Sequence, residues 1–361
     1  MRRQVAGVLS TTVVLAAGCD IPTSVPNWDM TWNLPASSTT ISVASFLPNG
    51  ISLAPSGAAF QATVNAVTIT RTLAQDCPAC TAGVAAPKPA YSSTVTSAPV
   101  SLPANVTAAT LITDTVFVTM VNRYQFDPIN PGGGAAGSMT FTVSSGGATL
   151  GTLALVGPAN TIPPNGATTT AKIPVSGTVS SAGVNLRVDV SSPQGSTITL
   201  TNPANQQFTY TARIGGSAQG PVIASSASVS LTNQQVRPNP VGYSLDFGSA
   251  DKADSALVIL TLNNPFNVSG NLNVNFLGCG DGNGNFSDSC PAFTTLVSRS
   301  VAITPGTTMV TFHFGTPGAK ALINTKQISF GGNVSGNTPI TPNQVISITS
   351  RFQLTLHTGS Q

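Results

Sequence analysis

Residues 116–122 read Val-Phe-Val-Thr-Met-Val-Asn, a run of β-branched and other apolar residues that ends in asparagine. Residues 257–263, 141 positions later, read Leu-Val-Ile-Leu-Thr-Leu-Asn and end in the same way. Such residues are enriched in strands, and a short apolar run is typical of a buried strand. The two stretches therefore predict the same central strand in two copies of one β-fold.

Two further pairs of segments follow in the same order. Residues 162–166 correspond to residues 303–306 with one residue of slip, and both lead into a threonine-rich strand. Residues 208–214 correspond to residues 346–352 at a shift of 138. Other alternating runs are separated by clusters of Gly, Pro, Asn and Ser, which form turns. We expect an all-β protein built of tandem immunoglobulin-like antiparallel β-sandwiches.

The same pattern divides the chain. We expect the first β-sandwich over residues 106–240 and the second over residues 241–361, with an additional N-terminal β region over residues 28–105. That region begins with Trp-Asp-Met-Thr-Trp-Asn at 28–33, where apolar and polar residues alternate, so one face of this strand should be buried. The pattern leaves open whether the N-terminal β region is a domain of its own or adds strands to the first sandwich.

The order of elements inside each copy carries a family resemblance. The strand that ends in asparagine leads into an Asn/Pro turn, Asp-Pro-Ile-Asn-Pro at 127–131 and Asn-Asn-Pro-Phe at 263–266. A strand, a Pro/Gly turn and a threonine-rich strand follow. This order resembles the water-stress β-sandwich of the late embryogenesis abundant type 2 family. The resemblance implies an immunoglobulin-like sandwich without catalytic residues.

Composition narrows the function classes. Charged residues make up 7% of the 361 residues, against about 25% in ordinary domains. The 11 acidic residues are all aspartate, and the chain has two histidines, His313 and His357. There is no basic run, so we expect no nucleic-acid partner. His313 lies between Phe312 and Phe314, which predicts an outward-facing strand position rather than a catalytic one.

The N-terminus has the pattern of an export signal. A cationic Met-Arg-Arg head precedes an apolar stretch, residues 5–17, which is shorter than the roughly 20 residues of a membrane span. Residues 15–19, Leu-Ala-Ala-Gly-Cys, resemble the lipobox of bacterial lipoproteins, although alanine stands where leucine is usual three residues before the cysteine. The resemblance implies removal of residues 1–18, lipidation of Cys19, and a tether over residues 19–27. An ordinary signal peptide, with Cys19 left as a structural thiol, is the alternative.

Four further cysteines form two local pairs, which fits disulfides of an oxidising compartment. The pairs are Cys77 with Cys80, and Cys279 with Cys290. Cys77 and Cys80 have the C-x-x-C spacing of redox sites. Because no helix signal follows them, a structural loop disulfide is the preferred interpretation, with a redox site or free or metal-bound thiols as alternatives.

The loop between the last two cysteines holds one candidate metal site. Asp281, Asn283 and Asn285 have the D-x-N-x-N spacing of a calcium loop, and Asp288 offers one more carboxylate. Phenylalanine and alanine stand where that motif needs glycine and glutamate. A polar loop closed by a disulfide is therefore the preferred interpretation, and calcium at weak extracellular affinity is the alternative; we expect no other cofactor.

These observations predict an exported protein, lipid-anchored to a bacterial membrane, at the outer membrane or the cell surface. We expect a non-enzymatic binding or structural role, such as surface adhesion or envelope scaffolding. Its partners would be the membrane, through the lipid anchor, and an envelope protein or glycan. The alternatives are a periplasmic carrier or chaperone for an apolar ligand, and a hydrolase with an aspartate-based site.

Overall fold

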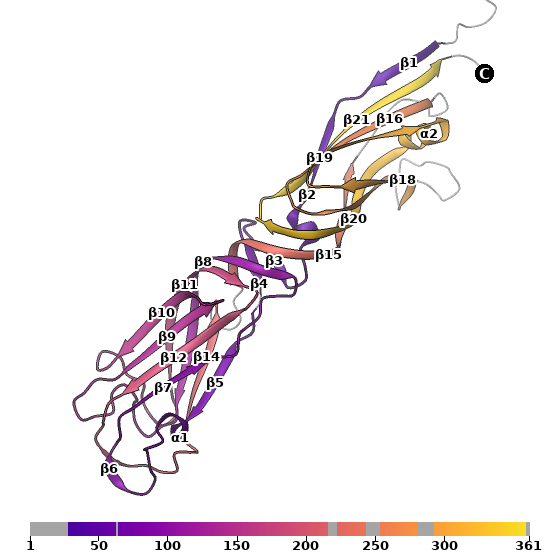
Figure 1. Cartoon of the computed structure of the whole chain (residues 1–361). Coiled ribbons are helices and arrows are strands. Elements are labelled where there is room, and N and C mark those ends of the chain that lie inside the picture. Colours follow the sequence, from indigo (N-terminus) through magenta and orange to yellow (C-terminus); the bar gives the residue numbers. More distant parts are fainter. Residues whose placement is uncertain (1–27, 63, 216–221, 243–252, 280–291, 359–361) are drawn as a thin grey trace, which may run out of the picture.

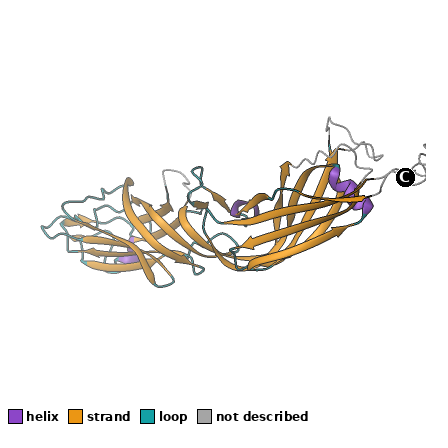
Figure 2. Ribbon diagram, turned by 90° about the horizontal axis from the view of Figure 1, so that it is seen from above, coloured by secondary structure: helices purple, strands orange, loops and turns teal. Residues whose placement is uncertain are grey.

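The computed structural model describes residues 28–62, 64–215, 222–242, 253–279 and 292–358. Antiparallel strands dominate these residues, which confirms the predicted all-β class. Figure 1 and Figure 2 show two β-sandwiches placed end to end, so that the body is elongated.

The first sandwich has two layers of four strands each, one of which is part of a larger sheet. One sheet has the order β11 (Ala167–Ser180), β8 (Val106–Asn122), β14 (Gln207–Ile214) and β5 (Val67–Thr72). The other has the order β10 (Ala148–Val156), β9 (Ser138–Ser145), β12 (Val184–Ser192) and β7 (Tyr91–Thr96). Side chains alternate across each strand, so every second residue enters one shared core, as Met139, Phe141 and Val143 do on β9.

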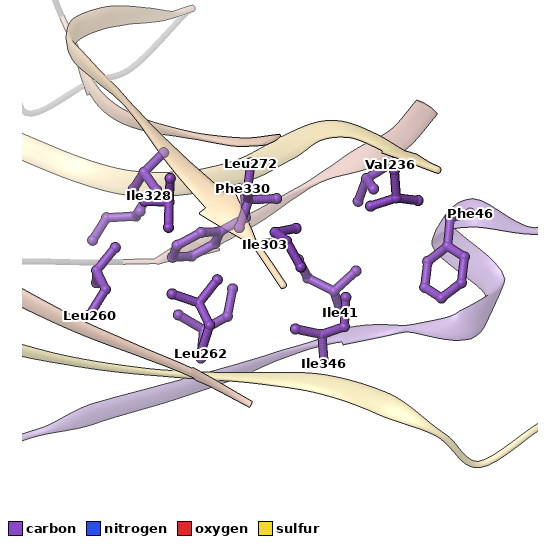
Figure 3. Packing of buried hydrophobic residues seen from close by; sticks show 14 of the residues in the cluster. Ile41, Phe46, Val236, Leu260, Leu262, Leu272, Ile303, Ile328, Phe330 and Ile346 are labelled. Atoms are coloured by element: carbon purple, nitrogen blue, oxygen red, sulfur yellow. The ribbon is translucent and has the colours of Figure 1, made fainter. Parts of the chain in front are cut away.

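The second sandwich has the same arrangement. One sheet contains β19 (Gly306–Phe314), β16 (Ala253–Asn264) and β21 (Val345–Thr358), with both β1 (Trp28–Asn33) and β2 (Ser37–Ser42) paired to β21. The other has the order β18 (Phe293–Ile303), β17 (Ser269–Cys279), β20 (Thr325–Ile340) and β15 (Val222–Gly242). In Figure 3, Leu262 and Ile346 from the first of these sheets face Phe330 and Ile303 from the second across the core.

Strand pairing shows that the two sandwiches correspond strand by strand. Met120 on β8 and Leu262 on β16 occupy the same place in their sheets, 142 positions apart. Their cross-strand partners are Thr169 and Tyr210 for Met120, and Thr308 and Ile348 for Leu262. The sequence comparison was wrong by one residue here, because Asn122 corresponds to Asn264 and not to Asn263. The predicted shift of 138 between residues 208–214 and 346–352 is confirmed, because Tyr210 on β14 corresponds to Ile348 on β21.

Residues 28–105 do not form a body of their own. β1, β2 and the 3-10 helix η1 (Val43–Phe46) belong to the second sandwich, whereas β5 and β7 complete the sheets of the first. Between them, the short strands β3 (Ile51–Leu53) and β4 (Phe60–Ala62) pair with each other, and β4 pairs with β15. The boundary predicted at residue 240 also shifts, because β15 is a strand of the second sandwich.

One sheet runs through both sandwiches. The first part of β15 pairs with the first part of β8, and the pairing continues from β15 to β20. Ala227 lies at the centre of this junction, with Ala109 on one side and Ile340 on the other. The two sandwiches are therefore joined by a continuous ladder of backbone hydrogen bonds rather than by a flexible linker.

The prediction of a buried face on the first strand is wrong. All six residues of β1 are exposed, including Trp28 at 62%, Met30 at 43% and Trp32 at 46%. β1 is an edge strand that pairs with the last residues of β21, and the buried core reaches only as far as Leu354 on that strand. The alternation of apolar and polar residues does form a strand, but this strand lies beyond the end of the core, so neither of its faces is buried.

Candidate binding surface at the distal end

The two ends of the body differ in what they carry. β1 begins and β21 finishes at the outer end of the second sandwich, which we call the terminal end (Figure 1). At the opposite end, four loops connect the strands of the first sandwich: residues 73–90, 123–137, 157–166 and 193–206. We call this the distal end.

The first distal loop is fixed by a short helix and a disulfide. Helix α1 (Leu73–Asp76) begins with a capping box, in which the Gln75 N–H donates to the Thr72 hydroxyl and the Thr72 N–H donates to the Gln75 side chain. Cys77 and Cys80 then form the predicted disulfide, with their Cα atoms 5.3 Å apart. Both half-cystines are buried. The C-x-x-C pair therefore braces a loop in the core.

The Asp127 carboxylate joins the second loop to the third. Its Oδ1 accepts the N–H groups of Ile129 and Asn130, and its Oδ2 accepts the Ile162 N–H at 2.7 Å. The Asn130 side chain also donates to the Asn160 carbonyl. An aspartate at a turn that satisfies several backbone donors is a structural element, so Asp127 sets the shape of these loops.

Two glutamines join the second loop to the fourth. The Gln206 side-chain amide donates to Gln125 Oε1 at 2.7 Å, and Gln206 Oε1 accepts the Gln125 backbone N–H at 3.1 Å. Gln125 Oε1 also accepts the Thr201 N–H at 2.7 Å. Because each loop is tied to its neighbour by side-chain hydrogen bonds, the loops form one connected surface.

Beneath the loops lies a buried acid. Asp76 is 5% exposed, and its carboxylate accepts a hydrogen bond from Arg71 Nε at 3.0 Å and from the Tyr124 hydroxyl at 2.8 Å. Burial, and then the negative charge of Asp76, raise the pKa of Tyr124 well above its ordinary value. Tyr124 therefore keeps its proton and remains a donor to Asp76.

A buried lysine is the least expected feature of this end. Lys88 is 1% exposed; its Nζ donates to Ser192 Oγ at 2.7 Å and lies 4.7 Å from the centre of the Tyr91 ring and 5.0 Å from that of Phe126. Burial lowers the pKa of Lys88 from 10.5 to about 8. The aromatic faces favour the ammonium and offset part of its desolvation. The sequence carries no signal for Lys88, because burial here is decided by residues from three separate strands and loops.

Ser192 and Lys88 have the composition of a serine–lysine catalytic pair. Ser192 is 2% exposed, however, and two aromatic rings lie against the amine. A substrate cannot reach Ser192 Oγ in this conformation. The pair acts here as a packed polar contact between β12 and the first loop.

Two segments of the distal surface are made of small, uncharged residues, and Arg123 adds one exposed charge at the start of the second loop. Residues 81–86 read Thr-Ala-Gly-Val-Ala-Ala and residues 132–136 read Gly-Gly-Gly-Ala-Ala, and all of them are exposed. Val84 is the largest apolar group there, at 60% exposure. Such a surface offers backbone hydrogen-bonding groups and close approach, with little electrostatic attraction.

The corresponding end of the second sandwich is covered instead. Phe266, which corresponds to Tyr124, is 1% exposed and packs edge-on against Phe46 of η1, with ring centroids 5.1 Å apart. That end faces the junction with the first sandwich (Figure 1). The same set of loops is therefore packed inside the body in one copy and presented to solvent in the other.

A cleft of about 690 Å³ lies at the junction, lined by residues 64–67 and 98–104 with Asn49 and Gly50. Most of these residues are exposed, so the cleft is an open surface feature with a mixed lining. It does not enclose an apolar ligand as the carrier alternative requires.

The remaining predicted sites divide between described and undescribed residues. Cys19, Cys290 and the calcium candidates Asp281, Asn283, Asn285 and Asp288 lie outside the described residues. Cys279, at the end of β17, is disulfide-bonded.

Both histidines are exposed on strands of the second sandwich. His313 faces outward from β19, as predicted, and His357 Nδ1 lies 2.8 Å from Asp29 Oδ1. Within the described ranges, no three Cys, His or Asp side chains gather as metal ligands would. In the same part of the chain, no helix has the length and apolar character needed to cross a membrane.

No protein-family model and no curated protein matches the chain. A "putative secreted protein" from Parabacteroides distasonis aligns over 90% of this chain and 99% of its own, at 10% identity and a TM-score of 0.34. A chain of the empty cowpea mosaic virus particle aligns over 83% of this chain and 91% of its own, at 8% identity and a TM-score of 0.21. These likenesses are too distant to support an argument about function.

Proposed function

We propose that this chain is a lipid-anchored protein of the bacterial cell envelope that presents its distal end for binding and has no enzymatic role. The main observation in support is that the two ends of the elongated body carry different features. The described chain begins and finishes at the terminal end, whereas the loops braced by Cys77 and Cys80 lie at the opposite end. Anchoring through Cys19 would direct those loops away from the membrane.

The tether length supports this orientation. Trp28 follows Cys19 by nine positions, and an extended chain of that length spans at most about 30 Å. Two or more acyl chains hold a protein stably at a bilayer. The terminal end would therefore stay close to the membrane, and the distal end would reach outward by the length of both sandwiches.

The distal surface indicates the class of partner. Its segments 81–86 and 132–136 are uncharged and consist of small side chains, and the Asp127 and glutamine contacts hold the loops in shape. A neutral glycan or a polar face of an envelope protein matches a surface that works by shape and hydrogen bonds. The Cys77–Cys80 disulfide supports an oxidising compartment, as expected outside the cytoplasm. We propose that the protein is located at the outer membrane or the cell surface. We also propose that it binds its partner without a cofactor.

Protease treatment of intact and lysed cells tests the location. We expect the chain to be degraded on intact cells, and Cys19→Ala to abolish labelling by radioactive palmitate. Protection until lysis would contradict the surface assignment, and unchanged labelling of the variant would contradict the anchor.

Two matched variants test the binding surface. Val84→Asp places a charge on the distal end, and Ile112→Asp places one on an exposed site of β8 away from the distal loops. Adhesion to glycan arrays and to envelope fractions should fall with the first variant and persist with the second. Equal loss in both would contradict a distal binding surface.

A further inference from the structure

Exposed aromatic side chains gather at the terminal end. Trp28, Trp32 and Phe293 are the exposed tryptophan and phenylalanine side chains of the described ranges. The tryptophans lie on β1, and Phe293 begins β18 opposite Cys279. Each of these strands has its outer end at the terminal end of the second sandwich (Figure 1).

The residues of β1 form a stripe on one face. Trp28, Met30 and Trp32 alternate along the strand, so their side chains leave the same side of the sheet. Trp32 pairs directly with Leu354, a core residue that is 2% exposed. Directly paired residues point to the same side. The stripe thus continues the apolar inner face of the sandwich outward, past the point where the core ends.

We propose that this stripe, Trp28, Met30 and Trp32, docks on the surface of a zwitterionic phospholipid bilayer. The inference deepens the proposed function and rests on its lipid anchor, because the tether over residues 19–27 keeps Trp28, the first residue of the stripe, within about 30 Å of Cys19. Tryptophan is the side chain best suited to a membrane interface, since its ring is apolar and its indole N–H remains hydrogen-bonded to headgroups or water.

Charge selects the class of lipid. Among the described residues at this end, Asp29 on β1 and Asp254 at the start of β16 are acidic, whereas Lys326 at the start of β20 and Lys320 on helix α2 (Thr316–Ile323) are basic. These described charges balance, so anionic headgroups gain no net attraction and docking depends on apolar burial in a neutral interface. Binding should consequently be insensitive to salt.

Intrinsic fluorescence isolates the stripe, because Trp28 and Trp32 are the only tryptophans in the chain. The protein to use is the chain from residue 20 onward, which lacks Cys19 and keeps every described residue. It is mixed with vesicles of phosphatidylcholine and phosphatidylethanolamine. We expect a blue shift of the emission, and quenching by lipids brominated near the headgroup end of their acyl chains.

Variants test which residues bind. Trp28→Ser with Trp32→Ser should lower vesicle co-sedimentation by at least about tenfold, with circular dichroism confirming the fold. Met309→Ser is the matched control, because Met309 is 70% exposed on β19 opposite Thr261, away from the stripe. Its co-sedimentation should equal that of the unchanged protein. If the double variant does not fold, the emission and quenching of the unchanged protein still decide the proposal.

These experiments test docking of the stripe independently of lipidation at Cys19. An unshifted emission on all vesicles would overturn docking, as would a shift on anionic vesicles alone. A shift that depends on protein concentration without vesicles would assign the stripe to a second copy of the chain and would also overturn it. Failure of palmitate labelling at Cys19 concerns the anchor and leaves the vesicle result to stand by itself.

Discussion

Asn122 and Asn264 make the same three hydrogen bonds at corresponding positions, 142 residues apart. Each side-chain amide donates to two backbone carbonyls, and each side-chain oxygen accepts the N–H of the residue two positions later. The partners are Phe126, Ile162 and Tyr124 for Asn122, and Val268, Thr304 and Phe266 for Asn264. Both asparagines are buried. Each one closes the turn that follows the central strand of its sandwich, which explains why both central strands end in asparagine.

Replacing either asparagine should be costly. Asn122→Ala and Asn264→Ala each leave one buried N–H and two carbonyls without their partner, so we expect a loss of about 2–4 kcal/mol in the free energy of unfolding. Urea denaturation measures it. Asn273→Ala, at an exposed position of β17, is the control and should change stability by less than about 0.5 kcal/mol. Losses equal to the control would show that the asparagine bonds are dispensable.

Lys88→Met should stabilise the protein and alter its pH dependence. The pKa of Lys88 is lowered to about 8 in the folded chain, against 10.5 ordinarily. Between these values the unfolded chain binds the extra proton, so the stability of the unchanged protein rises with pH through this window and is lowest below it. Lys88→Met removes the charge and should raise the free energy of unfolding at pH 7 by about 1–3 kcal/mol.

The measurement is denaturant unfolding from pH 7 to pH 10.5 for both proteins. The difference between them should shrink as the pH increases. Lys172→Met, on the exposed face of β11, is the matched control and should follow the unchanged protein at every pH. A variant that is less stable than the unchanged protein at pH 7 would show that the contacts with Ser192, Tyr91 and Phe126 outweigh the desolvation of the amine.

Cys77→Ser with Cys80→Ser should loosen the distal end. The disulfide closes a very short loop, for which the chain-entropy model gives about 2 kcal/mol. Loss of the bond should also speed proteolysis within residues 81–87, which are exposed and follow it directly. Limited proteolysis followed by mass spectrometry locates the cuts. Cleavage that begins in the second sandwich would contradict a local role for the bond.

The junction should make the two sandwiches unfold together. Ala227 pairs with Ala109 and Ile340, so the hydrogen-bond ladder continues from one sandwich to the other. Calorimetry of the unchanged protein should show one transition. Ala227→Pro removes a donor and constrains the backbone at this point, and should split the transition into two. Two transitions in the unchanged protein would mean that the shared sheet does not couple the sandwiches.

The local sequence pattern was sufficient to predict the central strands and part of the repeat. The run at 116–122 predicted a central strand, and β8 ends at Asn122 as expected. The repeat was offset by one residue at Asn263 because two asparagines stand side by side there. Only the buried hydrogen bonds of Asn264 show which of the two corresponds to Asn122. The Cys77–Cys80 bond followed from spacing, since its partners are neighbours in the chain.

By itself, the sequence determined the β class, the strands, the turns and the local disulfide, because alternation and turn chemistry act over a few residues. The tertiary structure alone decided that β1 and β2 pair with β21 more than 300 positions later, and that Lys88 is buried beneath the distal loops. It also decided that Trp28 and Trp32 lie beyond the core. Strand partners and burial depend on which edges meet in space, and residues far apart in the chain settle that jointly.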